Sequence, residues 1–162
     1  MSAHIYPRAA LGQGSPATPM YISAITIDLA SWPGTQSLPG QELWFAEVTV
    51  NGRFDASPAA DFSDLSFMTG KSRSRRKAPF TLSPGGPGLM TINLDTPYCY
   101  TGVGDLLIDW RNNAGQAPGP VSARVISGTS QGMFLTTTSQ PPSPWASNGY
   151  RNNAPMWITL HY

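Results

Sequence analysis

YISAITIDL, residues 21–29, shows the pattern that decides the fold. Its apolar side chains recur at every second position, with polar side chains between them. One face carries Tyr21, Ile25, Ile27 and Leu29, and the other carries Thr26 and Asp28. Side chains of a β-strand alternate between the two faces of a sheet, so this period predicts a strand with one buried face.

Four further stretches repeat this alternation. Their apolar positions are Trp44, Ala46, Val48 and Val50 in residues 43–50; Met90, Ile92 and Leu94 in residues 89–95; Leu106, Ile108 and Trp110 in residues 105–111; and Met156, Ile158, Leu160 and Tyr162 in residues 156–162. Asn51 and Gly52 form a turn signal directly after the first of them. Shorter strands are expected within residues 121–127 and 132–137.

Segments rich in proline and glycine separate these strands, at residues 84–88, 117–120 and 140–144. Proline has no N–H group for a strand ladder, so these segments are predicted loops. A short helical turn is expected from Ser57 and Pro58 alone. The pattern predicts an all-β fold, a jelly-roll-like antiparallel β-sandwich of roughly seven to nine strands. Residues 1–19 are expected to form an extended arm, and residues 20–162 a single sandwich domain.

Charged residues make up only 12% of the 162 residues, and the formal net charge is +1. A chain with so little net charge has no overall field that would draw it to nucleic acid or to an anionic membrane. No stretch reaches the ~20 consecutive apolar residues of a membrane helix. The start, MSAHIYPR, lacks the basic and apolar regions of a secretory signal.

The single cysteine, Cys99, excludes an internal disulfide and a metal site built from several cysteines. Its neighbours Tyr98 and Tyr100 indicate a buried thiol, which is the common environment of a free cysteine. A nucleophilic cysteine would need a nearby base. The two histidines, His4 and His161, lie at opposite ends of the chain.

No catalytic constellation is visible in the sequence, so no enzyme, cofactor or metal site is predicted. Asp105 and Asp109 lie four residues apart on one expected strand, about 13 Å from each other, which is too far for a carboxylate pair. Asp109 is expected to be solvated. A calcium site formed by Asp55, Asp61 and Asp64 is the alternative, but the regular spacing of a calcium loop is missing.

The most distinctive local feature of the sequence is a run of basic residues. Residues 71–77, KSRSRRK, hold five of the ten lysine and arginine residues and are expected to form a loop. Such a run can be a solvated hairpin tip, a contact to an acidic protein surface or a contact to nucleic acid. Nucleic acid is the least favoured of the three, because no aromatic residues are interleaved. The residues proposed for partner contact here are Arg73, Arg75 and Arg76.

The five tryptophans fall into two groups. Trp44 and Trp110 lie on the apolar faces of their strands and are predicted core residues. Trp32 and Trp145 adjoin prolines in expected loops, and Trp157 lies opposite the apolar face of the last strand. Trp32 and Trp145 are proposed as partner anchors, since tryptophan is enriched at binding hot spots. The alternative is that these loop tryptophans fold back and close an end of the sandwich.

Four stretches carry a resemblance: PMYISAI at residues 19–25, ASPAADF at 56–62, PYCY at 97–100 and GDLLID at 104–109. Together they resemble a family of bacterial exported β-domains of unassigned function, which often carry a C-terminal sorting segment. The resemblance implies an exported, all-β domain. It brings no catalytic residues, and the chain departs from the family in lacking an evident signal and a sorting tail.

Three functional hypotheses follow. The first is a non-enzymatic structural or assembly protein, such as a phage-type virion surface, decoration or fibre component that contacts other subunits and forms homo-oligomers. The second is an extracellular or cell-surface binding module, with glycans as a candidate ligand. An enzyme is the third and lacks a constellation. Localisation to a virion or to the outside of a cell follows from the first two hypotheses.

Overall fold

The computed structural model describes residues 2–11, 18–31, 37–48, 74–83, 86–112, 122–123 and 156–162. Almost all regular structure in these residues is β-strand. The strands are β1 (Ser2–Tyr6), β2 (Met20–Ser31), β3 (Leu38–Val48), β4 (Ser74–Leu82), β5 (Gly88–Tyr100), β6 (Asp105–Asn112), β7 (Ser122–Ala123) and β8 (Ile158–His161). A short 3-10 helix, η1 (Arg8–Leu11), follows β1.

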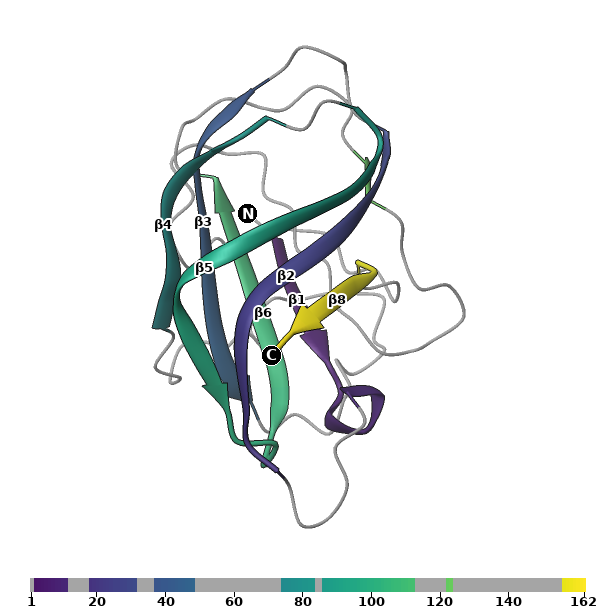
Figure 1. Cartoon of the computed structure of the whole chain (residues 1–162). Coiled ribbons are helices and arrows are strands. Elements are labelled where there is room, and N and C mark those ends of the chain that lie inside the picture. Colours follow the sequence, from purple (N-terminus) through teal and green to yellow (C-terminus); the bar gives the residue numbers. More distant parts are fainter. Residues whose placement is uncertain are drawn as a thin grey trace, which may run out of the picture.

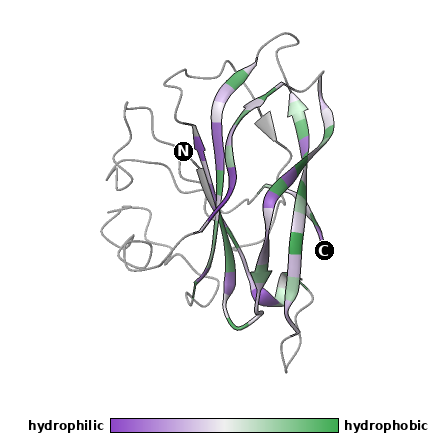
Figure 2. Ribbon diagram, turned by 60° about the vertical axis from the view of Figure 1, so that its left-hand side comes forward, coloured by the Kyte–Doolittle hydropathy of each residue, from purple (hydrophilic) through white to green (hydrophobic). Residues whose placement is uncertain are grey.

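The strands form two antiparallel sheets that pack face to face (Figures 1 and 2). Sheet A has the strand order β1-β6-β3-β4, and sheet B has the order β5-β2-β7 with β8 also paired to β2. This arrangement confirms the predicted antiparallel β-sandwich. Residues 2–6, which the sequence analysis assigned to an extended arm, are the edge strand β1 of sheet A.

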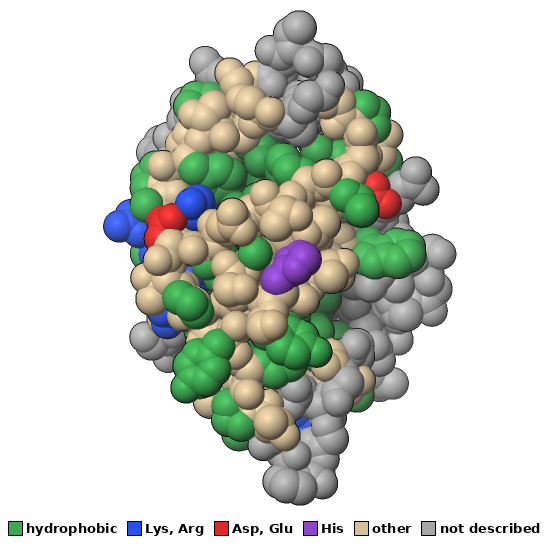
Figure 3. Space-filling view, viewed as in Figure 1, with side chains coloured by type: hydrophobic (Ala, Val, Ile, Leu, Met, Phe, Trp, Pro, Cys, Tyr) green, Lys and Arg blue, Asp and Glu red, His purple; other side chains and the backbone are tan. Residues whose placement is uncertain are grey.

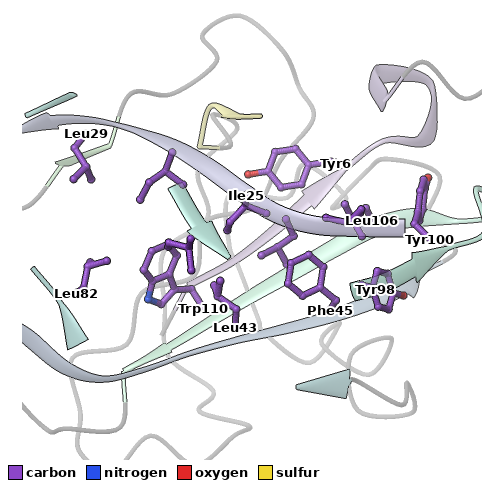
Figure 4. Close-up of a cluster of buried hydrophobic side chains, with 14 of the residues drawn as sticks. Tyr6, Ile25, Leu29, Leu43, Phe45, Leu82, Tyr98, Tyr100, Leu106 and Trp110 are labelled. Atoms are coloured by element: carbon purple, nitrogen blue, oxygen red, sulfur yellow. The ribbon is translucent and has the colours of Figure 1, made fainter. Parts of the chain in front are cut away.

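The core lies between the sheets and is built from the alternating side chains of both (Figure 4). Leu106, Ile108 and Trp110 on β6 and Ile92 on β5 are buried, as the period of two predicts. The Trp110 indole donates a 2.8 Å hydrogen bond to the Gln41 side-chain oxygen. Burying this large ring therefore leaves no polar N–H without an acceptor.

The alternation of β2 changes phase where its pairing with β5 is irregular. Ile22 pairs with Tyr98 and Ala24 with Asn93, so residues 94–97 of β5 lie opposite a single residue of β2. Pro97 lies in this bulge, where no ladder N–H is needed. Ile22 and Ile25 are both fully buried although they lie three residues apart, so β2 itself changes phase here and Tyr21 is exposed. The prediction that Tyr21 shares the core face was therefore wrong.

Strand β3 faces the core with the opposite set of side chains from the one predicted. Leu43 and Phe45 belong to the core cluster, whereas Trp44 lies on the outer face of sheet A and is half-buried. The prediction of a core Trp44 was wrong because Ala46 and Val48, which share its face, are also buried. With apolar residues on both faces, alternation alone does not indicate the core side.

Candidate functional site

The basic run is largely strand, not the predicted loop. Residues 74–77 form the start of β4, at the edge of sheet A, and residues 71–73 lie outside the described residues. Successive side chains of a strand point to opposite faces. Arg75 and Arg76 therefore do not converge on one partner, and the position of Arg73 relative to them is not described.

Arg75 belongs to a cluster of charged and aromatic side chains on the outer face of sheet A. Trp44 pairs with Arg75 on one side and with Asp109 on the other. The guanidinium carbons of Arg75 and Arg111 lie 6.0 and 4.4 Å from the Trp44 ring centroid. Two guanidinium groups thus lie within 6.0 Å of the ring centroid, where the electron-rich faces of the indole attract cations.

Two buried carboxylates complete this cluster. Glu42 accepts hydrogen bonds from the Trp44 indole at 2.9 Å and from Arg75 at 3.2 Å. Asp109, expected to be solvated, is fully buried and forms a 3.0 Å ion pair with Arg111. That prediction was wrong because Arg111, two residues further along β6, and Trp44, paired with Asp109 from the neighbouring strand β3, cover the carboxylate. The cluster is internally neutral, and the Arg75 side chain, 49% exposed, is its most accessible cation.

Arg76 and Lys77 hold β4 against β5. The Arg76 guanidinium lies 5.1 Å from the Tyr98 ring centroid and donates to the Pro97 carbonyl at 3.3 Å. Asp95 accepts 2.6 Å and 2.7 Å hydrogen bonds from Lys77 Nζ and the Ala78 N–H. The hydrogen bond from Lys77 lowers the pKa of Asp95. The irregular segment of β5 thus places the Asp95 carboxylate within hydrogen-bonding distance of β4.

Several residues singled out from the sequence lie outside the described residues. They are the partner candidates Arg73, Trp32 and Trp145, the helical turn at Ser57 and Pro58, and the calcium candidates Asp55, Asp61 and Asp64. No group of three or more metal-ligating side chains occurs in the part of the chain that the structure describes. None of the helices found there has the length and apolar character of a membrane span.

Cys99 is exposed, which corrects the prediction of a buried thiol. It pairs with Tyr21 across the two strands, and both side chains point outward from sheet B. Tyr98 and Tyr100, on the opposite face of β5, are the buried residues. Flanking residues on a strand point away from the one between them, so two core tyrosines place the cysteine outside.

A row of polar side chains crosses the outer face of sheet B. Thr26 on β2 pairs with Thr91 on β5 and with Thr159 on β8. Its hydroxyl is 2.6 Å from the Thr91 hydroxyl and 2.7 Å from Nε2 of His161. Thr26 is buried, whereas Thr91, Thr159 and His161 are exposed. The central hydroxyl therefore fixes the positions of two side chains that face solvent.

Contacts from β1 fix the chain just before β8. Tyr6 donates a 2.9 Å hydrogen bond to the Met156 carbonyl, and Nδ1 of His4 accepts one from the Met156 N–H at 3.4 Å. Burial lowers the pKa of His4 to about 4 and raises the pKa of Tyr6. Both groups are therefore neutral near pH 7. Trp157, directly after this anchored residue, is 57% exposed.

A group of exposed apolar side chains lies at one end of the sandwich. Tyr21 is near the start of β2, Val103 is in the β5–β6 turn, and Tyr162 follows β8. We call these three residues the apolar end. The turn is held rigidly, because the Glu47 carboxylate accepts hydrogen bonds from the Thr101 N–H and hydroxyl and from the Gly104 N–H.

The Tyr100 hydroxyl adds a 2.7 Å hydrogen bond to the Gly104 carbonyl. Burial raises the pKa of Tyr100 to about 12, so the hydroxyl keeps its proton and remains a donor. The β5–β6 turn is thus fixed to its own strand as well as to β3. The Val103 side chain therefore projects into solvent from a turn whose backbone is fixed by hydrogen bonds.

Comparison with models of protein families, with curated protein sequences and with solved structures found no match to this chain. The resemblance to exported bacterial β-domains therefore stays a prediction. The polar row of sheet B was not predicted from the sequence. It forms only because strand pairing places Thr91 opposite Thr26 and brings His161, paired with the nearby Ala24, within reach of the Thr26 hydroxyl.

Proposed function

We propose that this chain is a non-enzymatic structural and assembly protein that works through protein–protein contacts. Its proposed setting is a virion, as a phage-type surface, decoration or fibre component that forms a homo-oligomer or a larger assembly. The observation that carries this proposal is the apolar end. Its three large side chains, Tyr21, Val103 and Tyr162, are 64 to 80% exposed, and hydrogen bonds hold the turn that carries Val103.

Large apolar side chains grouped at a surface are characteristic of contact sites. At the apolar end the backbone that carries Val103 is ordered before any partner arrives, because Glu47 and Tyr100 fix the β5–β6 turn. Little conformational entropy is then lost on association. The low overall charge, 12% of residues, also keeps the electrostatic repulsion between copies small.

The test is the oligomeric state of the whole chain, measured by light scattering over a range of concentrations. The wild type is expected to associate, and Val103→Asp with Tyr162→Ser is expected to dissociate it. Leu89→Asp is the matched control, because Leu89 is as exposed as these residues but lies on β5 opposite Asp28, far from the start of β2. A monomeric wild type at all concentrations would refute the assembly role.

The basic run supplies a second arm of this test. Arg73→Ser, Arg75→Ser and Arg76→Ser combined are expected to weaken assembly, with the effect shrinking at high salt. Trp32→Ala and Trp145→Ala test the proposed anchors and should weaken assembly independently of salt. Assembly that is unchanged in all of these variants would remove the arginines and tryptophans from the interface.

The alternative is an extracellular or cell-surface binding module. One observation favours it, namely the polar row of Thr26, Thr91 and His161 on the exposed face of sheet B. A stable monomer that binds a ligand through this face would support the module, whereas an obligate oligomer would support assembly.

A further inference from the structure

The outer face of sheet B carries a compact set of uncharged side chains. We call it the platform and define it by six residues on three adjacent strands: Thr26 on β2, Thr91 and Asn93 on β5, and Trp157, Thr159 and His161 on and just before β8. It offers hydroxyl, amide, imidazole and indole groups. None of the six is a lysine, arginine, aspartate or glutamate, and the acidic Asp28, the next outward residue of β2 after Thr26, adjoins them opposite Leu89.

The polar part of the platform is ordered in advance. Thr26 holds the Thr91 hydroxyl and the His161 ring at 2.6 and 2.7 Å, and the Ser23 hydroxyl donates to the His161 carbonyl at 3.1 Å. Nε2 of His161 is engaged, so the Nδ1 edge of the ring is available to a ligand. Side chains that are already fixed lose little entropy on binding, which favours recognition of a specific polar ligand.

Trp157 provides a flat aromatic surface beside this row. Its backbone lies between Met156, held by His4 and Tyr6, and Ile158, which pairs with Ile27. The electron-rich face of an indole attracts C–H groups that carry partial positive charge, and the ring is more than half exposed. A sugar ring presents such C–H groups on its faces and hydroxyl groups around its edge.

The distribution of polarity argues for a sugar and against a second protein. A stable protein interface has an apolar centre and a polar rim. On sheet B the order is reversed, since the threonines and His161 lie in the middle while Trp157, Leu89 and Tyr21 lie toward the margins. Figure 3 shows mostly uncharged groups across the middle of this face, with lysine, arginine and acidic side chains at its edges.

The charge and size of the platform limit the kinds of ligand that it can bind. With no lysine or arginine among its residues, it offers no cation to bind a sulfate, phosphate or carboxylate group of an acidic glycan. Three strands and the span from Trp157 to His161 cover about 10 by 13 Å, which is larger than one pyranose ring. We propose that the platform binds an uncharged oligosaccharide, which stacks on Trp157 and hydrogen-bonds to His161, Asn93 and the exposed threonines.

This proposal goes beyond the assembly role and uses different residues. The test is titration calorimetry of the full chain with uncharged gluco-, xylo-, manno- and N-acetylglucosamine tetrasaccharides. At least one is expected to bind with an affinity that does not change with salt. Trp157→Ala should weaken binding at least tenfold, Trp157→Phe less, and His161→Ala and Asn93→Ala several-fold.

Leu89→Ala is the matched control on the same sheet and should bind as the wild type does. Thermal melts by circular dichroism confirm that each variant is folded. The proposal fails if no uncharged tetrasaccharide binds, if Trp157→Ala binds unchanged, or if only acidic glycans bind in a salt-sensitive way. It also fails if the wild type binds no sugar and Trp157→Ala abolishes self-association. In that case the outer face of sheet B binds a second copy of the chain. The variant that combines Val103→Asp with Tyr162→Ser is expected to lose assembly, which light scattering would show, and should still bind sugar as the wild type does. The two proposals can therefore fail independently.

Discussion

The hydroxyl of Tyr6 donates a 2.9 Å hydrogen bond to the carbonyl of Met156, which is 150 residues further along the chain. Tyr6 ends the edge strand of sheet A, and Met156 precedes the β8 strand of sheet B. One hydrogen bond therefore joins the two sheets through segments close to the two chain ends. It also fixes the backbone that presents Trp157.

Replacing Tyr6 with phenylalanine tests this junction. The variant keeps the packing of the ring but leaves the Met156 carbonyl without its hydroxyl donor, so the free energy of unfolding should fall by about 1 kcal/mol. Urea unfolding measures the change, and faster amide exchange in β8 should accompany it. Tyr21→Phe, at an exposed tyrosine, should stay within about 0.5 kcal/mol of the wild type. Equal effects of the two variants would contradict a stabilising role for the junction.

The buried His4 predicts a dependence of stability on pH. Burial lowers its pKa to about 4 in the folded chain, from the value of 6.5 for an unperturbed histidine. The unfolded chain therefore binds more protons between these two pH values. Stability is complete above pH 6.5, falls as the pH drops toward 4, and loses about 3 kcal/mol in all.

Urea unfolding at a series of pH values measures this loss. His4→Asn, in which an amide oxygen can still accept the Met156 N–H, should remove most of the slope between pH 6.5 and 4. A variant that retained the full slope would place its origin in another group.

Gly104 lies where β3 and the β5–β6 turn approach most closely. A Cβ atom at this position would be 2.8 Å from the Val48 carbonyl oxygen, which is backbone and cannot swing away. Gly104→Ala should push the turn from β3, strain its hydrogen bonds to Glu47, and lower stability by about 1 to 3 kcal/mol. Thermal unfolding measures the effect, with Val103→Ala as a control expected to be close to neutral. A stable Gly104→Ala variant would show that the turn can shift freely.

Arg75 is expected to contribute to stability as well as to any interface. Arg75→Ser leaves the buried Glu42 carboxylate with the Trp44 indole but without its cation. Solvent screening at a half-exposed arginine keeps the expected loss to about 1 kcal/mol. A double-mutant cycle with Glu42→Gln should show coupling, and Arg8→Ser, at an exposed arginine, should have little effect. Strictly additive effects would contradict the pairing.

Prediction from sequence succeeded for the core faces of β5 and β6. Met90, Ile92 and Leu94 pack in the core as their alternation indicated, and so do Leu106, Ile108 and Trp110, although Leu107 and Asp109 on the other face of β6 are buried as well. Prediction failed for Trp44, because both faces of β3 are apolar, and for Tyr21, because the alternation of β2 changes phase between Ile22 and Ile25. A period of two extended from Ile25 back to Tyr21 misses such a change of phase.

For the candidate surfaces, the sequence supplied residue types but not their neighbours. It identified the basic run at residues 71–77 and predicted that Trp157 lies away from the apolar face. It did not show that Arg75 and Arg76 would contact Trp44 and Tyr98, or that Cys99 would face solvent. Those outcomes depend on which strands become adjacent.

The sequence by itself determined that this chain forms an antiparallel β-sandwich, because a period of two is a local property that each strand displays unaided. Only the tertiary structure decided that Thr26 would lie between Thr91 and His161, since strand pairing brings together residues 65 and 135 positions apart. Register is set by the packing of the whole core and by bulges in neighbouring strands. The surfaces proposed here for assembly and for sugar binding are therefore products of that register.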